Sequence, residues 1–183
     1  MTSQALFESF LNYPLAGDVF VFSSFEKGIE NLKKNFSAFD SLVNRNDFGT
    51  ALMNKYITYS SYSSKKLENQ SSFNKGEHSV KLSLLELISP QSITNKNISN
   101  SETLHLINAL VTNYTQKKNN PEIYGTMSLS TCAWSINKLL ILNKADDKFI
   151  LKDKYIEDGN VFSQEVLEEI VNKAKLYIKS LGN

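Results

Sequence analysis

The chain contains little of the material from which catalytic and metal sites are usually built. Its 183 residues include one cysteine, two histidines and seven glycines. Cys132 cannot form a disulfide within the chain, and seven glycines supply few phosphate-binding loops. The motifs G-x-x-x-x-G-K-[ST], G-x-G-x-x-G, G-x-S-x-G and H-E-x-x-H are all absent. We therefore expect no cofactor and no metal, and the scarcity of catalytic residue types argues against an enzyme.

Arginine is equally scarce, since Arg45 is the only arginine among 20 basic residues. The formal net charge is +1. Nucleic-acid binding draws most of its affinity from neutralised phosphates, and arginine supplies the bidentate contacts that lysine does not reproduce. The composition therefore predicts no nucleic-acid partner.

Long apolar runs are missing as well. No window approaches the ~18 uninterrupted apolar residues that a transmembrane helix needs, so we expect no membrane span. Residues 1–8 lack the basic region and apolar core of a signal peptide. Together with a single free cysteine, this favours the cytoplasm. The alternative is the mature part of an exported, surface-associated helical protein whose signal has been removed.

What the sequence does contain is helical periodicity. Hydrophobic residues make up 41% and charged residues 21%, which is ordinary globular usage and indicates a single helical domain over residues 1–183. Apolar side chains recur at intervals of three and four over 101–118, 128–140 and 163–178. The pattern predicts an all-α protein of antiparallel helix pairs with little or no sheet.

Three segments depart from this pattern. Val19–Phe22 is the best short strand candidate, with a buried connection or the start of a helix as the alternative. Phe149–Ile156 alternates weakly enough to be a strand or an extended link. Residues 60–75 are rich in serine, lysine and asparagine and carry few large apolar groups. We predict a mobile loop there, between N-terminal and C-terminal helical units.

One short pattern occurs twice. Ala51-Leu52-x-x-x-Tyr56 has a counterpart in Ala109-Leu110-x-x-x-Tyr114. In both places the pattern lies in the second half of a predicted helix. Two related helical units stacked side by side would give an α-solenoid-like arrangement. The alternative is coincidence between two amphipathic helices.

The only nucleophile of note is Cys132. Near a helix N-terminus a thiolate is stabilised by the helix dipole, and either His78 or His105 would then be the base of a thiol-dependent hydrolase or transferase. However, Cys132 shares an apolar stripe with Leu129 and Ile136, and a free cysteine behaves as a small buried hydrophobe. We therefore favour a core cysteine and keep the thiol enzyme as the alternative function.

Tyrosine and tryptophan supply the candidate binding residues. Tyr56, Tyr59 and Tyr62 follow one another at intervals of three, and Trp134 lies off the main stripe of its helix. Both residue types are enriched at binding hot spots, although packing inside the fold is the commoner fate of a tryptophan. We expect a non-catalytic helical interaction protein, of the adaptor or immunity type, that binds a protein or peptide through these four residues.

Overall fold

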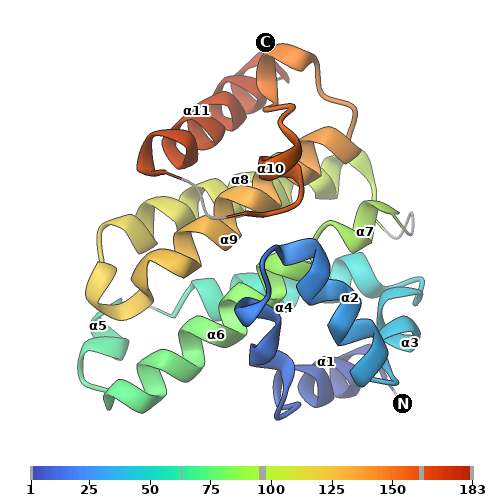
Figure 1. Ribbon diagram of the computed structural model, residues 1–183, viewed down its shortest axis with the longest axis vertical. Helices are drawn as coiled ribbons and strands as arrows, with labels where there is room; N and C mark the ends of the chain where they lie inside the picture. Colours follow the sequence, from blue (N-terminus) through green and yellow to red (C-terminus); the bar gives the residue numbers. More distant parts are fainter. Residues whose placement is uncertain (1, 63, 95–97, 161–162, 182–183) are drawn as a thin grey trace.

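The computed structural model describes residues 2–62, 64–94, 98–160 and 163–181 (Figure 1). These residues fold into helices, and no strand occurs among them. The predicted all-α class is therefore confirmed. The helices are α1 (Ser3–Leu11), η1 (Ala16–Val21), α2 (Phe25–Asn35), α3 (Phe39–Val43), α4 (Phe48–Ser60), α5 (Ser64–Glu68), α6 (Ser72–Ile88), α7 (Gln91–Thr94), α8 (Asn100–Lys118), α9 (Pro121–Leu142), η2 (Asp147–Phe149), α10 (Lys154–Glu157) and α11 (Gln164–Leu181).

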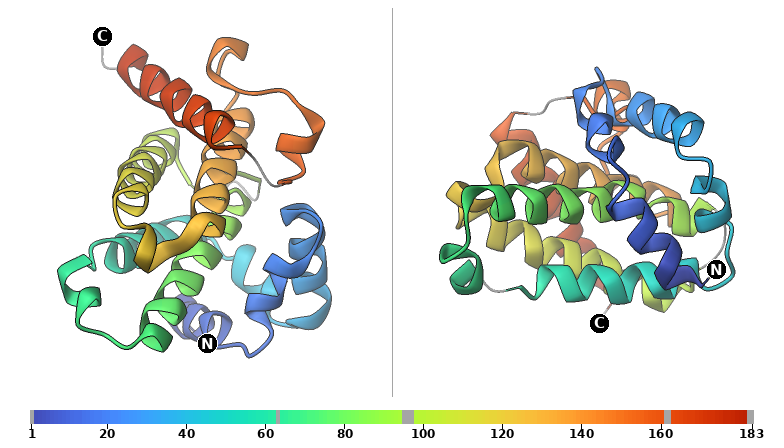
Figure 2. Two further views of the ribbon diagram at one scale, coloured as in Figure 1. Left: turned by 60° about the vertical axis from the view of Figure 1, so that its left-hand side comes forward. Right: turned by 90° about the horizontal axis from the view of Figure 1, so that it is seen from below.

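The central element is α9. Helices α6, α8 and α11 pack around it, and α8 and α9 form a hairpin through a two-residue connection (Figures 1 and 2). Residues 128–137 are all buried, so this helix has no solvent face over three turns. Buried apolar side chains from α1 to α11 join one cluster around it. The α-solenoid arrangement stays a prediction.

Helix starts follow local capping chemistry. Ser99 caps α8 in a capping box, in which its side chain accepts from Glu102 N and the Glu102 carboxylate accepts from Ser99 N. Helix α9 begins at Pro121, seven residues before the apolar repeat over 128–140 that predicted it. Proline suits the first helical position because the missing N–H has no partner there in any case.

Neither predicted strand is present. Val19–Phe22 falls largely in η1, whose Val19 packs under α2 at Gly28. A Cβ at position 28 would clash with the Val19 carbonyl oxygen, so the glycine permits this close approach. Phe149–Ile156 contains the end of η2 and the first turn of α10. Val19 meets the core from the 3-10 helix η1, whereas Val21 and Phe22 are exposed. The described residues offer no neighbouring strand for Val19–Phe22 to pair with.

The segment 60–75 is not a continuous loop. Helix α4 runs to Ser60, α5 occupies Ser64–Glu68, and α6 begins at Ser72. Leu67 is buried and anchors α5, while Lys65 and Lys66 are exposed. The mobility of this segment stays a prediction.

The start of α2 is in contact with the turn that follows α10, far along the chain. The backbone N–H of Phe25 donates to Gly159 O at 3.3 Å, and Lys138 Nζ pairs with Glu26 Oε1 at 2.7 Å. Gly159 has φ +76°, and a side chain there would strike the Phe25 ring, so only glycine fits this turn. Helix α10 thereby covers the start of α2 (Figure 1). Among the described residues, no helix combines the length and hydrophobicity that crossing a membrane requires.

Candidate functional site

The three tyrosines of the predicted binding series lie at very different depths. Tyr56 is 1% exposed, Tyr59 is half-buried, and Tyr62 is 45% exposed. The reason is the course of α4, which runs out of the core and ends at Ser60. Tyr59 and Tyr62 reach the surface together. Tyr56 does not, so the prediction that it contacts a partner is wrong for this folded state.

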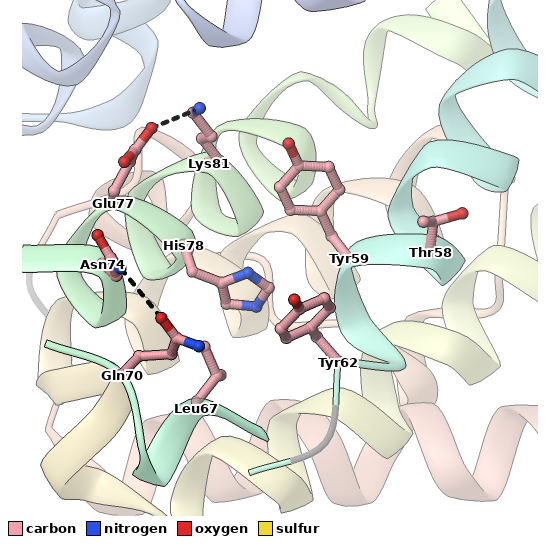
Figure 3. Close-up of a pocket in the computed structure, with 9 residues that line it drawn as sticks. All are labelled: Thr58, Tyr59, Tyr62, Leu67, Gln70, Asn74, Glu77, His78 and Lys81. Atoms are coloured by element: carbon pink, nitrogen blue, oxygen red, sulfur yellow. Dashed lines mark hydrogen bonds and ion pairs between the residues drawn. The ribbon is translucent and has the colours of Figure 1, made fainter. Parts of the chain in front are cut away.

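Tyr59 and Tyr62 converge on His78, which lies on α6 (Figure 3). The Tyr59 and His78 rings are stacked, with centroids 5.6 Å apart and planes at 14°. The Tyr62 ring is tilted against His78 at 5.4 Å and 38°. The three rings form one wall of a surface hollow of about 430 Å³, which we call the tyrosine–histidine pocket. Its lining residues are Thr58, Tyr59, Tyr62, Leu67, Gln70, Asn74, Glu77, His78 and Lys81.

His78 is the chemically distinctive residue of the pocket. Burial lowers the pKa of its imidazole, and the positive charge of Lys117 behind it lowers that pKa further. The ring is therefore neutral near pH 7. Its Nε2 is buried and has no hydrogen-bond partner among the described residues. A buried polar atom of this kind is costly unless a water or a ligand satisfies it.

The rim of the pocket is polar but electrically balanced. Asn74 Nδ2 donates to Gln70 Oε1 at 3.0 Å, and Lys81 Nζ pairs with Glu77 Oε1 at 2.6 Å. Lys81 also donates to Asn12 Oδ1 at 2.8 Å. These contacts fix the side chains of one face of α6. They leave the pocket with no unpaired charge on that face.

Lysines lie over the outer faces of both tyrosines. Lys55 Nζ is 5.5 Å from the centroid of the Tyr59 ring, and Lys66 Nζ is 5.5 Å from that of Tyr62. Lys55 also pairs with Glu8. A cation over a ring face is attracted to the ring quadrupole and holds the ring in place. The tyrosines are thus positioned from both sides, by histidine and by lysine.

Directly behind the pocket the core contains a buried ion pair. Lys117 Nζ donates to Glu86 Oε1 and Oε2 at 2.8 and 2.7 Å, and both side chains are fully buried. Tyr56 donates to Glu86 Oε1 at 3.1 Å, and Asn113 Nδ2 donates to both Tyr56 Oη and Glu86 Oε1 at 2.9 and 3.0 Å. We call Tyr56, Glu86, Asn113 and Lys117 the core polar cluster. Burial and the neighbouring Glu86 charge raise the pKa of Tyr56 well above its ordinary value, so the hydroxyl stays protonated.

Cys132 belongs to the core, as expected. It is fully buried on α9, and its thiol donates to Leu110 O at 3.4 Å. Burial, followed by the charge of Glu86, raises the pKa of the thiol well above its ordinary value. A buried, protonated thiol is a poor nucleophile, and this geometry lends no support to the thiol-dependent alternative. His105 is exposed on α8.

Trp134 is also a core residue. It is 1% exposed, it packs edge-on against Phe25 at 5.5 Å, and its indole N–H donates to Glu157 O at 2.9 Å. It therefore joins α9 to α2 and α10 inside the fold. The prediction that Trp134 contacts a partner is wrong for this folded state, because Phe25 and α10 cover the ring.

The described residues contain further hollows beside the tyrosine–histidine pocket. Hollows of about 640 and 590 Å³ flank the exposed side of α6, and both are lined by Gly17, Ser72, Gly76 and Val80. Neither of their linings contains a histidine. Within the described ranges, no group of three histidine, cysteine or acidic residues is arranged to hold a metal ion.

Comparisons with known proteins give no relative from which a function could be transferred. No protein-family model matches the chain, and neither a curated protein nor a solved structure does. A function of the tyrosine–histidine pocket therefore has to follow from its own geometry.

Proposed function

We propose that this chain is a non-catalytic binding protein that holds a protein or peptide partner in the tyrosine–histidine pocket. The observation that carries the proposal is the stack of Tyr59, His78 and Tyr62 at the wall of an open hollow. Aromatic rings fixed before binding offer a large contact area at a small cost in side-chain entropy. An adaptor or an immunity-type protein would use such a site.

The proposal separates binding from chemistry. His78 has no acidic or nucleophilic side chain bonded to it, whereas a general base needs a substrate proton or an orienting partner within hydrogen-bond reach. Cys132 is sealed in the core. A near-zero net charge favours a protein partner over nucleic acid.

A random peptide library displayed on phage tests the proposal directly. The purified full chain serves as bait, and the enriched peptides are synthesised and their affinities measured by calorimetry. We expect the enriched peptides to share a motif and to lose about tenfold or more in affinity for Tyr62→Ala. Tyr155→Ala is the matched control, because Tyr155 is 74% exposed on α10 and lies outside the pocket.

Two results would count against the proposal. In the first, the enriched peptides bind Tyr62→Ala as tightly as the parent protein. In the second, they lose affinity equally for Tyr155→Ala, which would indicate adhesion to any exposed tyrosine.

A further inference from the structure

We propose that His78 is a pH-sensitive switch, which holds the wall of the tyrosine–histidine pocket together when neutral and releases Tyr62 and α5 when protonated. The inference rests on the proposed function and names the regulation of that site. Three features lead to it: the contacts of the His78 ring, the burial of its Nε2 atom and the charges around it.

The His78 ring connects the parts of the pocket wall. Its centroid is 5.6 Å from that of Tyr59 and 5.4 Å from that of Tyr62 (Figure 3). Tyr62 lies beyond the end of α4, and it is followed by the five-residue helix α5, which is anchored by the buried Leu67. A short element with few buried side chains opens at a lower free energy than the long helices around it. Contact with His78 therefore restrains a segment that opens readily.

The burial of Nε2 leaves no room for a second donor on the ring. A neutral imidazole carries one N–H group, whereas the protonated ring carries two. Nε2 is buried and has no hydrogen-bond partner among the described residues. Protonation would therefore leave a charged N–H group without an acceptor, which is costlier than an unpaired neutral atom. Water satisfies both N–H groups only after the cover of the ring has moved away.

Positive charges around the ring also oppose its protonation in place. Lys55 and Lys66 each lie 5.5 Å from the centroid of a tyrosine ring in the wall. The tyrosine rings that would otherwise stabilise an imidazolium already interact with these two cations. Burial, followed by the charge of Lys117 in the core, lowers the pKa of His78. A protonated His78 would thus be a further cation among three lysines.

The acidic groups on either side of the ring are already occupied. At the rim Glu77 pairs with Lys81 at 2.6 Å, and in the core Glu86 pairs with Lys117 at 2.7 Å. Tyr124 on α9 adds no negative charge, because burial raises the pKa of its hydroxyl. Protonation of the imidazole therefore favours an open arrangement, in which the two tyrosines no longer form one wall and the proposed partner dissociates.

An NMR titration of the full chain from about pH 7.5 to about pH 5 tests the switch without any variant. The ring signals of Tyr59 and Tyr62 should move toward those of free tyrosine as the pH falls. Their midpoint should equal that of the His78 ring signals and lie below pH 6.5. The protection of the α5 amides should fall by up to about tenfold for each pH unit by which the folded pKa lies below 6.5.

His78→Phe keeps the ring and removes the site of protonation. A phenyl ring forfeits no hydrogen bond at the position of Nε2, because Nε2 has none among the described residues. The tyrosine signals of His78→Phe should stay constant with pH. Those of His105→Gln, which removes the exposed histidine, should follow the parent protein. Constant tyrosine signals while His78 of the parent protein takes up its proton would overturn the inference, and so would an unchanged pH response in His78→Phe.

A binding measurement separates this inference from the proposed function. Peptides enriched from the displayed library at about pH 7.5 should bind the parent protein about tenfold more weakly at about pH 5, and His78→Phe within about twofold at both. An equal loss in both proteins overturns the inference and leaves the pocket as a peptide site. If the library yields no peptide, the proposed function fails, and the NMR titration alone decides whether His78 opens the wall.

Discussion

His78 is the residue at which the surface pocket and the protein interior meet. Its ring faces two tyrosines on the pocket side, while the charge of Lys117 acts on it from the core. Protonation of this one ring would place a second positive charge near Lys117. The same position would thus affect both the proposed binding of a partner and the stability of the fold.

The lowered pKa of His78 predicts a pH-dependent stability. The ordinary histidine pKa is 6.5, and the folded value is lower, so the unfolded chain binds the proton more readily. The His78 contribution is therefore complete above pH 6.5 and is lost as the pH falls through the folded pKa. We expect His78→Gln to flatten the decline in unfolding free energy from about pH 7 to about pH 5, as measured in urea.

His105→Gln is the control for that measurement, because it removes the other histidine, which is exposed. Its curve should follow that of the parent protein. Parallel curves for the parent protein and His78→Gln would show that His78 has an ordinary pKa in the folded state.

Burial of Cys132 predicts slow reaction with thiol reagents. In the native protein the thiol should react more slowly than a free thiol by a factor of about 10² or more, because reaction requires local opening. In denaturant it should react at once. Tyr155→Cys supplies an exposed thiol as an internal reference, and the two thiols should react in two well-separated phases. A single fast phase of two thiols in the native protein would contradict the burial and revive the enzyme alternative.

At the scale of elements, the pocket depends on α4 and α6 lying side by side with the short helix α5 between them in sequence. Sequence periodicity predicts each long helix, but not which faces meet. His78 is therefore isolated in the sequence, 16 residues after Tyr62 and in a different helix from Tyr59. Its place against Tyr59 and Tyr62 follows only from the packing of α4 on α6.

Two glycines in helices predict opposite effects of the same substitution. A Cβ at Gly76 of α6 would meet no atom within 4 Å, so Gly76→Ala should stabilise the protein by about 0.5–1 kcal/mol through helix propensity. Gly28→Ala gains the same propensity in α2, but its methyl group would clash with the Val19 backbone. We expect a net loss of at least about 1 kcal/mol there. Urea midpoints that rise for both variants would contradict the close packing of α2 on η1.

The long helices α8 and α11 were predictable from the sequence, whereas the 3-10 helix η1 was not. Helices α8 and α11 carry long apolar stripes with polar caps, and such signals are local. The segment of η1 looks like a strand because Val19, Phe20 and Val21 are apolar and adjacent. Its true conformation depends on contact with α2, which local patterning does not record.

The candidate site was foreseen in part. Tyrosines at the end of a helix tolerate exposure, which made Tyr59 and Tyr62 predictable as surface residues. Tyr56 and Trp134 were expected at the surface but are buried, because the spacing of residues does not show how deeply a side chain lies. The core polar cluster did have a signal. Glu86 stands among Leu84, Leu85 and Leu87, and a lone carboxylate inside a leucine-rich stretch indicates a buried partner.

At the scale of the whole molecule, the core polar cluster joins α4, α6 and α8, and Lys117 extends it to α9 through Ser128 O at 3.2 Å. Removing one charge from a buried pair leaves the other uncompensated. Replacing both charges by apolar groups of similar size avoids that penalty. The cluster is therefore expected to fix how these helices meet more than to add stability.

Lys117→Met should lower the unfolding free energy by about 3–5 kcal/mol, because it leaves the buried Glu86 carboxylate without its opposite charge. The double variant Glu86→Leu, Lys117→Met should recover most of that loss, since Tyr56 and Asn113 keep the bond that joins them. Equilibrium urea unfolding measures both. A loss of unfolding free energy below about 1 kcal/mol for Lys117→Met would mean that the pair is not desolvated as described. The same would follow if the loss in the double variant equalled the sum of the losses in the two single variants.

The turn at Gly159 determines when the start of α2 can make its final contacts during synthesis of the chain. Phe25 and Glu26 bond to a turn that leaves the ribosome roughly 130 residues later, on the order of ten seconds at usual elongation rates. Until then the start of α2 and the Trp134 ring lack their cover. A nascent chain stalled before α10 would therefore expose this apolar surface, to which a chaperone is expected to bind.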